Sequence, residues 1–126
     1  IDFREDVPEL GRSSVQRIVQ LMKEAGLTTK VSSIHVNGWF GNYDKLTMIN
    51  CLFAEAFRID LDREKEHFIF VGDSPNDQPA FDYFPNAVGV ANVVDFIDDL
   101  IVLPAYVTDA RAGAGFVELT EFLLAV

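Results

Sequence analysis

The sequence predicts an α/β fold whose strands form a parallel sheet. Two observations predict it. Short apolar strands alternate with helical segments from about residue 45 onward, and one strand, "HFIFV", is a continuous apolar run typical of strands covered on both faces. Parallel strands need such helical crossovers between them. With 126 residues, 49% of them hydrophobic, the chain can build one ordinary core or parts of two domains.

The first 43 residues predict one helix and one strand. Apolar residues recur at helical spacing over 14–25, where Ser13 or Ser14 can cap the start and Gly26 follows the end. The segment 30–40, "KVSSIHVNGWF", alternates polar and apolar residues and is rich in β-branched side chains. We expect a half-exposed strand there.

The rest of the chain predicts a repeated order of helix and strand. The period returns to 3.6 over 45–57, through Leu46, Ile49 and Phe53. Short strands are then expected at 67–71, 87–92 and 105–110, and the last two are followed by segments that can be helical, 93–100 and 115–126. Gly113 and Gly115 are expected in the turn before the last helix.

Composition and charge exclude several classes of protein. The formal charge of −10, with only ten Lys and Arg, argues against nucleic-acid binding, which needs clustered cations. No apolar run reaches the ~20 residues of a membrane span, and no signal peptide is visible.

A lone Cys51 on a helix predicts a core position and a reducing, cytoplasmic compartment. Because the chain begins with Ile1 rather than Met, we expect it to be part of a longer protein.

The most informative stretch is "FIFVGDSPND", where the apolar strand ends in an acidic turn. Ligands gather at the carboxyl ends of parallel strands, and Asp73 lies at such an end with Gly72 freeing the backbone to turn. Asn76 and Asp77 open the following helix, so simple N-capping is the alternative explanation for these two residues. Hard oxygen ligands clustered at one turn suit Mg²⁺, which keeps several waters. A magnesium site is therefore predicted.

Competing motifs require residues that this sequence lacks at the corresponding positions. A calcium loop of the EF-hand type starting at Asp73 would need an oxygen ligand where Pro75 stands. A serine nucleophile elbow would need glycine where Asn76 stands, and both histidines precede Ser74. No lysine follows a glycine, so no P-loop is present.

Lys45 is the second informative residue. A cation in the first turn of a helix faces the positive end of the helix dipole, which costs a few tenths of a kcal/mol up to ~1. If this helix starts beside the Asp73 turn, Lys45 supplies the positive charge with which an acidic pocket can hold phosphate. The alternative is an exposed lysine beside Asp44 that contributes little.

The segment "VGDSPNDQPAFDYFPNAVGVANV", preceded by the helix-opening Lys45, resembles the last two motifs of the haloacid dehalogenase superfamily, in its sugar-phosphatase-like branch. "KVSSIHVNGWFGNYDKL" resembles the closing strand of the branch's α/β cap and the return to the core. The resemblance implies a three-layer αβα, Rossmann-like core. Residues 1–41 would be the end of the cap domain, and residues 42–126 the second half of the core.

The resemblance also implies roles for individual residues. Asp73 would bind Mg²⁺ directly, Asn76 would join it at the metal, and Asp77 would orient the metal or its waters. Lys45 would hold the nucleophilic carboxylate and the phosphoryl oxygens. The implied reaction is phosphoryl transfer to an aspartate and hydrolysis of the aspartyl phosphate, with small phosphorylated metabolites, sugar phosphates among them, as substrates. His35, Asn37 and Trp39 are the candidates for the substrate-facing side of the cap.

The sequence departs from this family in two respects. The family's second motif, a Ser or Thr that ends a strand, has no match in a corresponding context. The family's Asp-x-Asp-x-Thr motif, which bears the nucleophile, occurs nowhere in these 126 residues, so the chain has no candidate nucleophile. The missing part would include the strand beside "HFIFV", and an exposed sheet edge is expected there. Two functions remain open: a Mg²⁺-dependent phosphatase of which this chain is a portion, or a non-catalytic binding module of the same fold.

Overall fold

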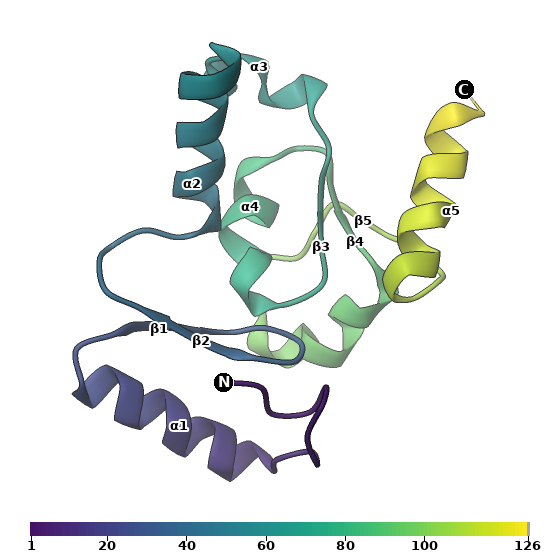
Figure 1. The fold of residues 1–126 in the computed structure, drawn as a ribbon. Helices are drawn as coiled ribbons and strands as arrows, with labels where there is room; N and C mark the ends of the chain where they lie inside the picture. The colour runs from purple at the N-terminus through teal and green to yellow at the C-terminus, as the bar shows by residue number, and fades with distance from the viewer. Residues whose placement is uncertain (126) are drawn as a thin grey trace. The chain divides into compact units, whose positions relative to one another are not determined.

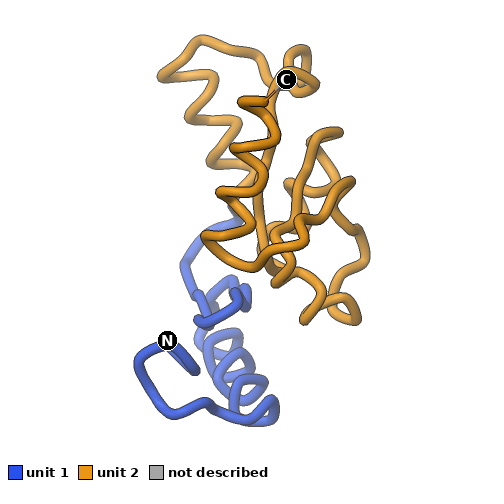
Figure 2. The backbone as a smooth tube through the Cα atoms, turned by 90° about the vertical axis from the view of Figure 1, so that its right-hand side faces the viewer, with its two compact units in different colours: residues 1–43 blue, residues 44–126 orange. Residues whose placement is uncertain are grey.

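The computed structural model describes residues 1–125, which form two compact units. Unit 1 comprises residues 1–43, and unit 2 begins at residue 44 (Figure 2). The domain boundary expected after residue 41 stays a prediction. Within the described residues, no helix is long and apolar enough to cross a membrane.

Unit 1 is a helix packed on an antiparallel hairpin. Helix α1 (Arg12–Glu24) is followed by β1 (Thr28–Val31) and β2 (Val36–Trp39), which pair from Thr28 opposite Trp39 to Val31 opposite Val36. The prediction of a single strand over 30–40 is therefore wrong. The hydroxyl of Ser32 accepts hydrogen bonds from the backbone N–H groups of Ile34 (3.4 Å) and His35 (2.9 Å), which closes a turn between the two strands.

The ends of α1 differ in how well the sequence predicted them. Its N-cap is Gly11, which makes no side-chain cap, so the expected serine cap is wrong. At the other end Gly26 adopts φ +85°, a left-handed conformation that glycine reaches without a Cβ penalty. The predicted glycine stop is confirmed.

Unit 2 contains a parallel three-stranded sheet in the order β3-β4-β5 (Figure 1). Its strands are β3 (Phe70–Gly72), β4 (Ala87–Gly89) and β5 (Tyr106–Val107), and Gly72 lies opposite Gly89. The predicted α/β class and parallel pairing are confirmed. The strands are shorter than the sequence indicated, because each ends where the chain turns into the next connection.

Helices lie on both sides of this sheet, with α2 and α4 on one side and α5 on the other (Figure 1). The helical segments of unit 2 are α2 (Lys45–Leu52), the π-helix η1 (Phe53–Phe57), α3 (Leu61–Glu64), the 3₁₀ segments η2 (Lys65–His67), η3 (Pro75–Asp77) and η4 (Ala91–Asp99), and the helices α4 (Gln78–Tyr83) and α5 (Ala112–Leu124). The expected helix over 45–57 thus ends in a π-helical turn. Arg58 then takes a left-handed φ of 60° and ends it.

The core of unit 2 lies between the sheet and the helices α2 and α4. Its buried members are Leu61, Ala80, Phe81, Phe84, Ala87 and Val93. Phe70 of β3 packs against it, with ring centroids 5.8 Å from Phe81 and 5.9 Å from Phe84. Because Leu46, Ile49 and Phe53 also pack against this cluster, the core fixes which way α2 faces.

Two sequence expectations about small residues in unit 2 are wrong. Cys51 is exposed, since it lies two residues from the core-facing Ile49 and thus on the opposite side of α2. Gly113 and Gly115 lie inside α5, which begins at Ala112, rather than in a turn before it. A Cβ on Gly115 would stand 2.4 Å from the Ala110 carbonyl oxygen, so glycine permits the close packing of the first turn of α5.

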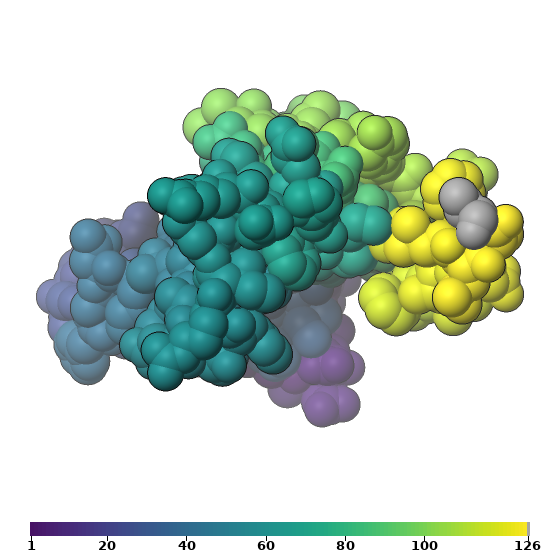
Figure 3. Space-filling view, turned by 90° about the horizontal axis from the view of Figure 1, so that it is seen from above, coloured from purple at the N-terminus to yellow at the C-terminus, as the bar shows by residue number. Residues whose placement is uncertain are grey.

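The other side of the sheet is only partly covered. A groove of ≈ 630 Å³ lies between the sheet and α5, and its walls include Ile69, Val88, Tyr106 and Phe122. Phe122 is 68% exposed and Tyr106 is 62% exposed. Figure 3 shows the outer surface of α5 in yellow, at the C-terminal end of unit 2. Among the described residues β3 pairs only with β4, so its other edge is open, as the sequence led us to expect.

Candidate functional site at the end of β3

The candidate site is the turn that follows β3, at the carboxyl end of the parallel sheet. The strand ends at Gly72, Asp73 follows, and the 3₁₀ turn η3 leads directly into α4. In this position backbone amides and short polar side chains converge. It is the part of an open parallel sheet where ligands usually bind.

Asp77 is the centre of the turn. Its side chain is only 1% exposed, and its Oδ2 accepts hydrogen bonds from the backbone N–H groups of Asp73 (2.9 Å) and Ser74 (3.3 Å). Its Oδ1 forms an ion pair with the ammonium group of Lys45. A buried carboxylate needs partners of this kind to offset its desolvation. Both carboxylate oxygens of Asp77 are therefore paired, and its contacts include more than capping.

Lys45 reaches the turn from a segment 32 residues earlier in the chain. It is the first residue of α2, and Asp44 caps that helix by accepting the Thr47 N–H at 2.8 Å. The pair with Asp77 offsets the unfavourable dipole at the helix start. Because the Lys45 side chain is 49% exposed and an ammonium carries three protons, it retains donors for an anionic ligand.

Asp73 and Asn76 flank a buried hydroxyl. The Oγ of Ser74 lies 3.0 Å from Asp73 Oδ1 and 2.6 Å from Asn76 Oδ1, and Ser74 is 1% exposed. Asp73 and Asn76 themselves are half-buried. The structure therefore brings Lys45, Asp73, Asn76 and Asp77 into one cluster.

The donor set of this cluster fits a hard divalent cation in part. Asp73 contributes a carboxylate and Asn76 an amide oxygen, which are oxygen ligands of the type Mg²⁺ prefers, and Mg²⁺ keeps several waters. Gly72 keeps room for the arrangement, since a Cβ there would stand 2.6 Å from Asp77 Oδ2. With Asp77 held by Lys45, the cluster supplies one half-buried carboxylate.

The other predicted residues lie in unit 1, on β2 and the turn before it. Asn37 and Trp39 belong to β2, and His35 precedes it; by strand alternation they share the face opposite Val36 and Gly38. A Cβ on Gly38 would meet Leu27 and Met22, so that opposite face is the one that packs on α1. The indole N–H of Trp39 donates to the Tyr43 carbonyl at 3.0 Å, while Asn37 is exposed.

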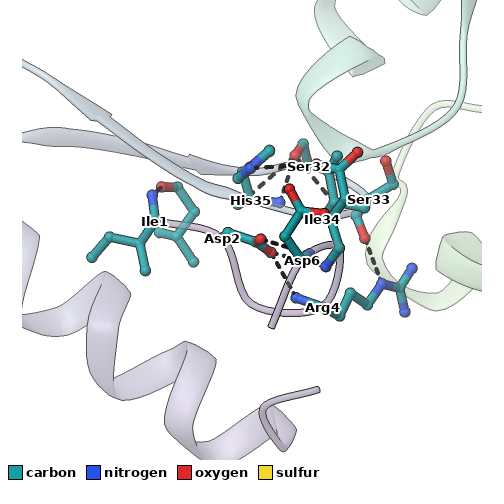
Figure 4. A network of polar contacts seen from close by, with 10 residues as sticks. Ile1, Asp2, Arg4, Asp6, Ser32, Ser33, Ile34 and His35 are labelled. Carbon is teal, nitrogen blue, oxygen red and sulfur yellow. Dashed lines mark hydrogen bonds and ion pairs between the residues drawn. The ribbon is translucent and has the colours of Figure 1, made fainter. Parts of the chain in front are cut away.

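His35 belongs to a cluster that sequence reasoning missed. Its Nε2 lies 3.8 Å from Glu5 Oε2, and one ligand atom each of Asp2, Glu5 and His35 lies within 4.8 Å of the others. Figure 4 shows Asp2 and His35 within the surrounding network of polar contacts. Backbone N–H groups of Glu5 and Asp6 bond to the Asp2 carboxylate and lower its pKa. Asp2 thus organises the N-terminal turn, and no sequence spacing signals its meeting with His35, 33 positions later.

Comparison with known proteins supports the fold class. No family model and no curated protein matches the chain. The crystal structure of Thermoplasma acidophilum 0175 is similar, with a TM-score of 0.62 and 19% identity over 93% of this chain. The chain spans 48% of that protein's length. At this identity the likeness concerns the fold alone, and the fold is a mixed α/β one with a parallel sheet.

Proposed function

We propose that the turn after β3 belongs to a Mg²⁺-dependent phosphatase of small phosphorylated metabolites, with sugar phosphates as the substrate class. The observation that carries the proposal is the meeting of Lys45 with Asp77 beside Asp73 and Asn76. A cation and a set of hard oxygens at the carboxyl end of a parallel sheet are what a phosphate ester and a divalent metal require. The resemblance of "GDSPND" and Lys45 to the haloacid dehalogenase motifs supports the same reading.

In this proposal each residue has a defined task. Asp73 and Asn76 would hold Mg²⁺, which when bound neutralises phosphoryl charge. Asp77 holds Lys45 and the two backbone amides in place. Lys45 presents its remaining protons to the phosphoryl oxygens and to the attacking carboxylate. That carboxylate would come from a segment outside these 126 residues, since Asp77 is engaged and Asp73 is assigned to the metal.

A second candidate function is a non-catalytic binding module. It is favoured by one observation: the 126 residues contain no Asp-x-Asp-x-Thr motif to supply a nucleophile. The partners proposed for the phosphatase are its small substrate and Mg²⁺. We propose a cytoplasmic location, because these 126 residues hold a single cysteine, as is usual in a reducing compartment.

The test is an assay of the complete gene product on a panel of sugar phosphates with and without Mg²⁺, for the wild type and Asp73→Ala. We expect Mg²⁺-dependent phosphate release from the wild type, and less than a tenth of its kcat from the variant. Thermal unfolding without metal should be unchanged, or slightly raised because one carboxylate leaves an acidic turn. A wild-type protein without phosphatase activity would favour the binding module.

A further inference from the structure

The hydroxyl of Ser74 has more oxygen neighbours than it has protons. It lies 3.0 Å from Asp73 Oδ1 and 2.6 Å from Asn76 Oδ1, in a side chain that is 1% exposed. A serine hydroxyl carries one proton and can donate to only one of these two acceptors. Two oxygen lone pairs facing each other at the second contact would be repulsive in a buried position.

Turning the Asn76 amide about its last bond resolves the conflict, because its NH₂ group then faces the serine oxygen. Asn76 Nδ2–H donates to Ser74 Oγ, and Ser74 Oγ–H donates to Asp73 Oδ1. The carboxylate Oδ2 of Asp73 and the amide Oδ1 of Asn76 take no part in this chain of bonds. They are the two oxygens left for a cation.

We propose that Ser74 is a positioning residue, whose hydroxyl locks Asp73 and Asn76 together so that one oxygen of each is presented to the metal. The inference rests on the proposed function, since it concerns the same metal site. It assigns a task to a buried polar side chain that neither the metal nor the phosphate would touch. Groups that hold metal ligands in this way typically change metal affinity by 10–100-fold when they are removed.

A purely structural role predicts something different. Ser74 precedes η3, and a serine there commonly caps the following turn. If capping were its whole contribution, Ser74→Ala would lower thermal stability and leave metal affinity unchanged. Thr108→Val is the matched control, because Thr108 is also buried and its hydroxyl donates to the Ala110 carbonyl at 2.8 Å, after β5.

The first measurement is Mn²⁺ binding by electron paramagnetic resonance, with Mn²⁺ as the probe for Mg²⁺. Wild type, Ser74→Ala, Asn76→Ala, the double variant and Thr108→Val are compared in the complete gene product. We expect about tenfold weaker binding for Ser74→Ala and wild-type binding for Thr108→Val. The loss of affinity in the double variant should be smaller than the product of the two single losses, since Ser74 acts in part through Asn76.

The second measurement needs no metal. In the nuclear magnetic resonance spectrum of the wild type, the side-chain NH₂ of Asn76 should exchange slowly with water, and in Ser74→Ala it should exchange faster. Equal Mn²⁺ affinity of Ser74→Ala and wild type overturns the positioning role and leaves the metal site standing. Absence of any Mn²⁺ binding by the wild type overturns the metal site itself. Should Ser74→Ala not fold, rapid exchange of the wild-type Asn76 NH₂ is sufficient to refute the inference.

Discussion

At the scale of single residues, Asp77 and Lys45 show how a buried charge organises a turn. Asp77 is 1% exposed and holds two backbone amides and one ammonium group, so its carboxylate is compensated on both oxygens. Lys45 is half exposed: its ammonium group pairs with Asp77 and keeps further protons for a ligand. Removal of either partner leaves the other in an unfavourable environment.

Lys45→Met should therefore reduce both stability and activity. The buried Asp77 loses its ammonium partner, which we expect to cost about 1–3 kcal/mol of unfolding free energy, measured by urea denaturation. In the complete enzyme, kcat should fall by roughly 100-fold, the scale of losing one preorganised electrostatic contact. Lys30→Met, on the exposed side of β1, is the control and should change neither quantity. Unchanged turnover for Lys45→Met would remove Lys45 from the site.

Tyr83 gives the stability a dependence on alkaline pH. Burial, and the hydrogen bond that its hydroxyl donates to Asp62 at 2.7 Å, raise the pKa of Tyr83 to about 12. An unfolded tyrosine ionises near pH 10, so between about pH 10 and 12 the unfolded state binds fewer protons and stability falls as pH rises. Tyr83→Phe should flatten this part of the urea-denaturation profile. An identical slope in both proteins would contradict the assignment.

At the scale of elements, the end of β3 and the start of α2 depend on each other through small distances. Gly72 leaves space for Asp77, whose Cγ would stand 2.7 Å from a Cβ at that position. The cap of α2 at Asp44 sets where the helix begins, and hence where the Lys45 side chain emerges. The site is thus built by two element ends that the core of unit 2 holds together.

Gly72→Ala tests this dependence against a matched substitution. The new methyl group would displace the Asp77 carboxylate, and we expect a loss of about 1–3 kcal/mol in unfolding free energy, together with weaker Mn²⁺ binding. Gly113→Ala in α5 meets nothing within 4 Å and should stabilise the protein by about 0.5–1 kcal/mol, since alanine favours the helix. Equal effects of the two changes would show that Gly72 is not required for space.

At the scale of the whole molecule, the sheet of unit 2 is only partly covered. The edge of β3 is open among the described residues, and the groove beside α5 exposes aromatic side chains such as Tyr106 and Phe122. The similar structure from Thermoplasma acidophilum is about twice as long as the matched region. Open edges of this kind favour pairing with another strand.

The 126-residue chain should accordingly be inert and self-associating. We expect no phosphate release from sugar phosphates with Mg²⁺, because at the turn after β3 Asp77 is paired with Lys45 and Asp73 is assigned to the metal. We also expect a concentration-dependent mass in light scattering. Phe122→Glu places a charge in the groove and should lower that mass. Ile101→Glu, at a residue 90% exposed that does not line the groove, is the control. Metal-dependent turnover by the 126-residue chain would mean that a residue within it performs the attack.

The sequence by itself determined the features that depend on neighbouring residues. Helical periodicity located α1 and α2, short apolar runs located the parallel strands, and the Gly-Asp-Ser-x-Asn-Asp motif located the turn after β3. The end of α1 at the left-handed Gly26 was likewise predictable from neighbouring residues. These signals lie within a few residues of each other, and so they can be read from one stretch of chain.

Only the tertiary structure decided which distant segments meet. It split the segment 30–40 into a hairpin, because the Ser32 hydroxyl closes a turn that alternation alone does not reveal. It turned Cys51 outward, because the core against α4 fixed the orientation of α2. Lys45 and Asp77 lie 32 residues apart. From the sequence, Lys45 could be assigned to the site only on the condition that its helix starts beside the Asp73 turn. Packing of α2 on α4 brings the two together, and packing is a property of all the core residues at once.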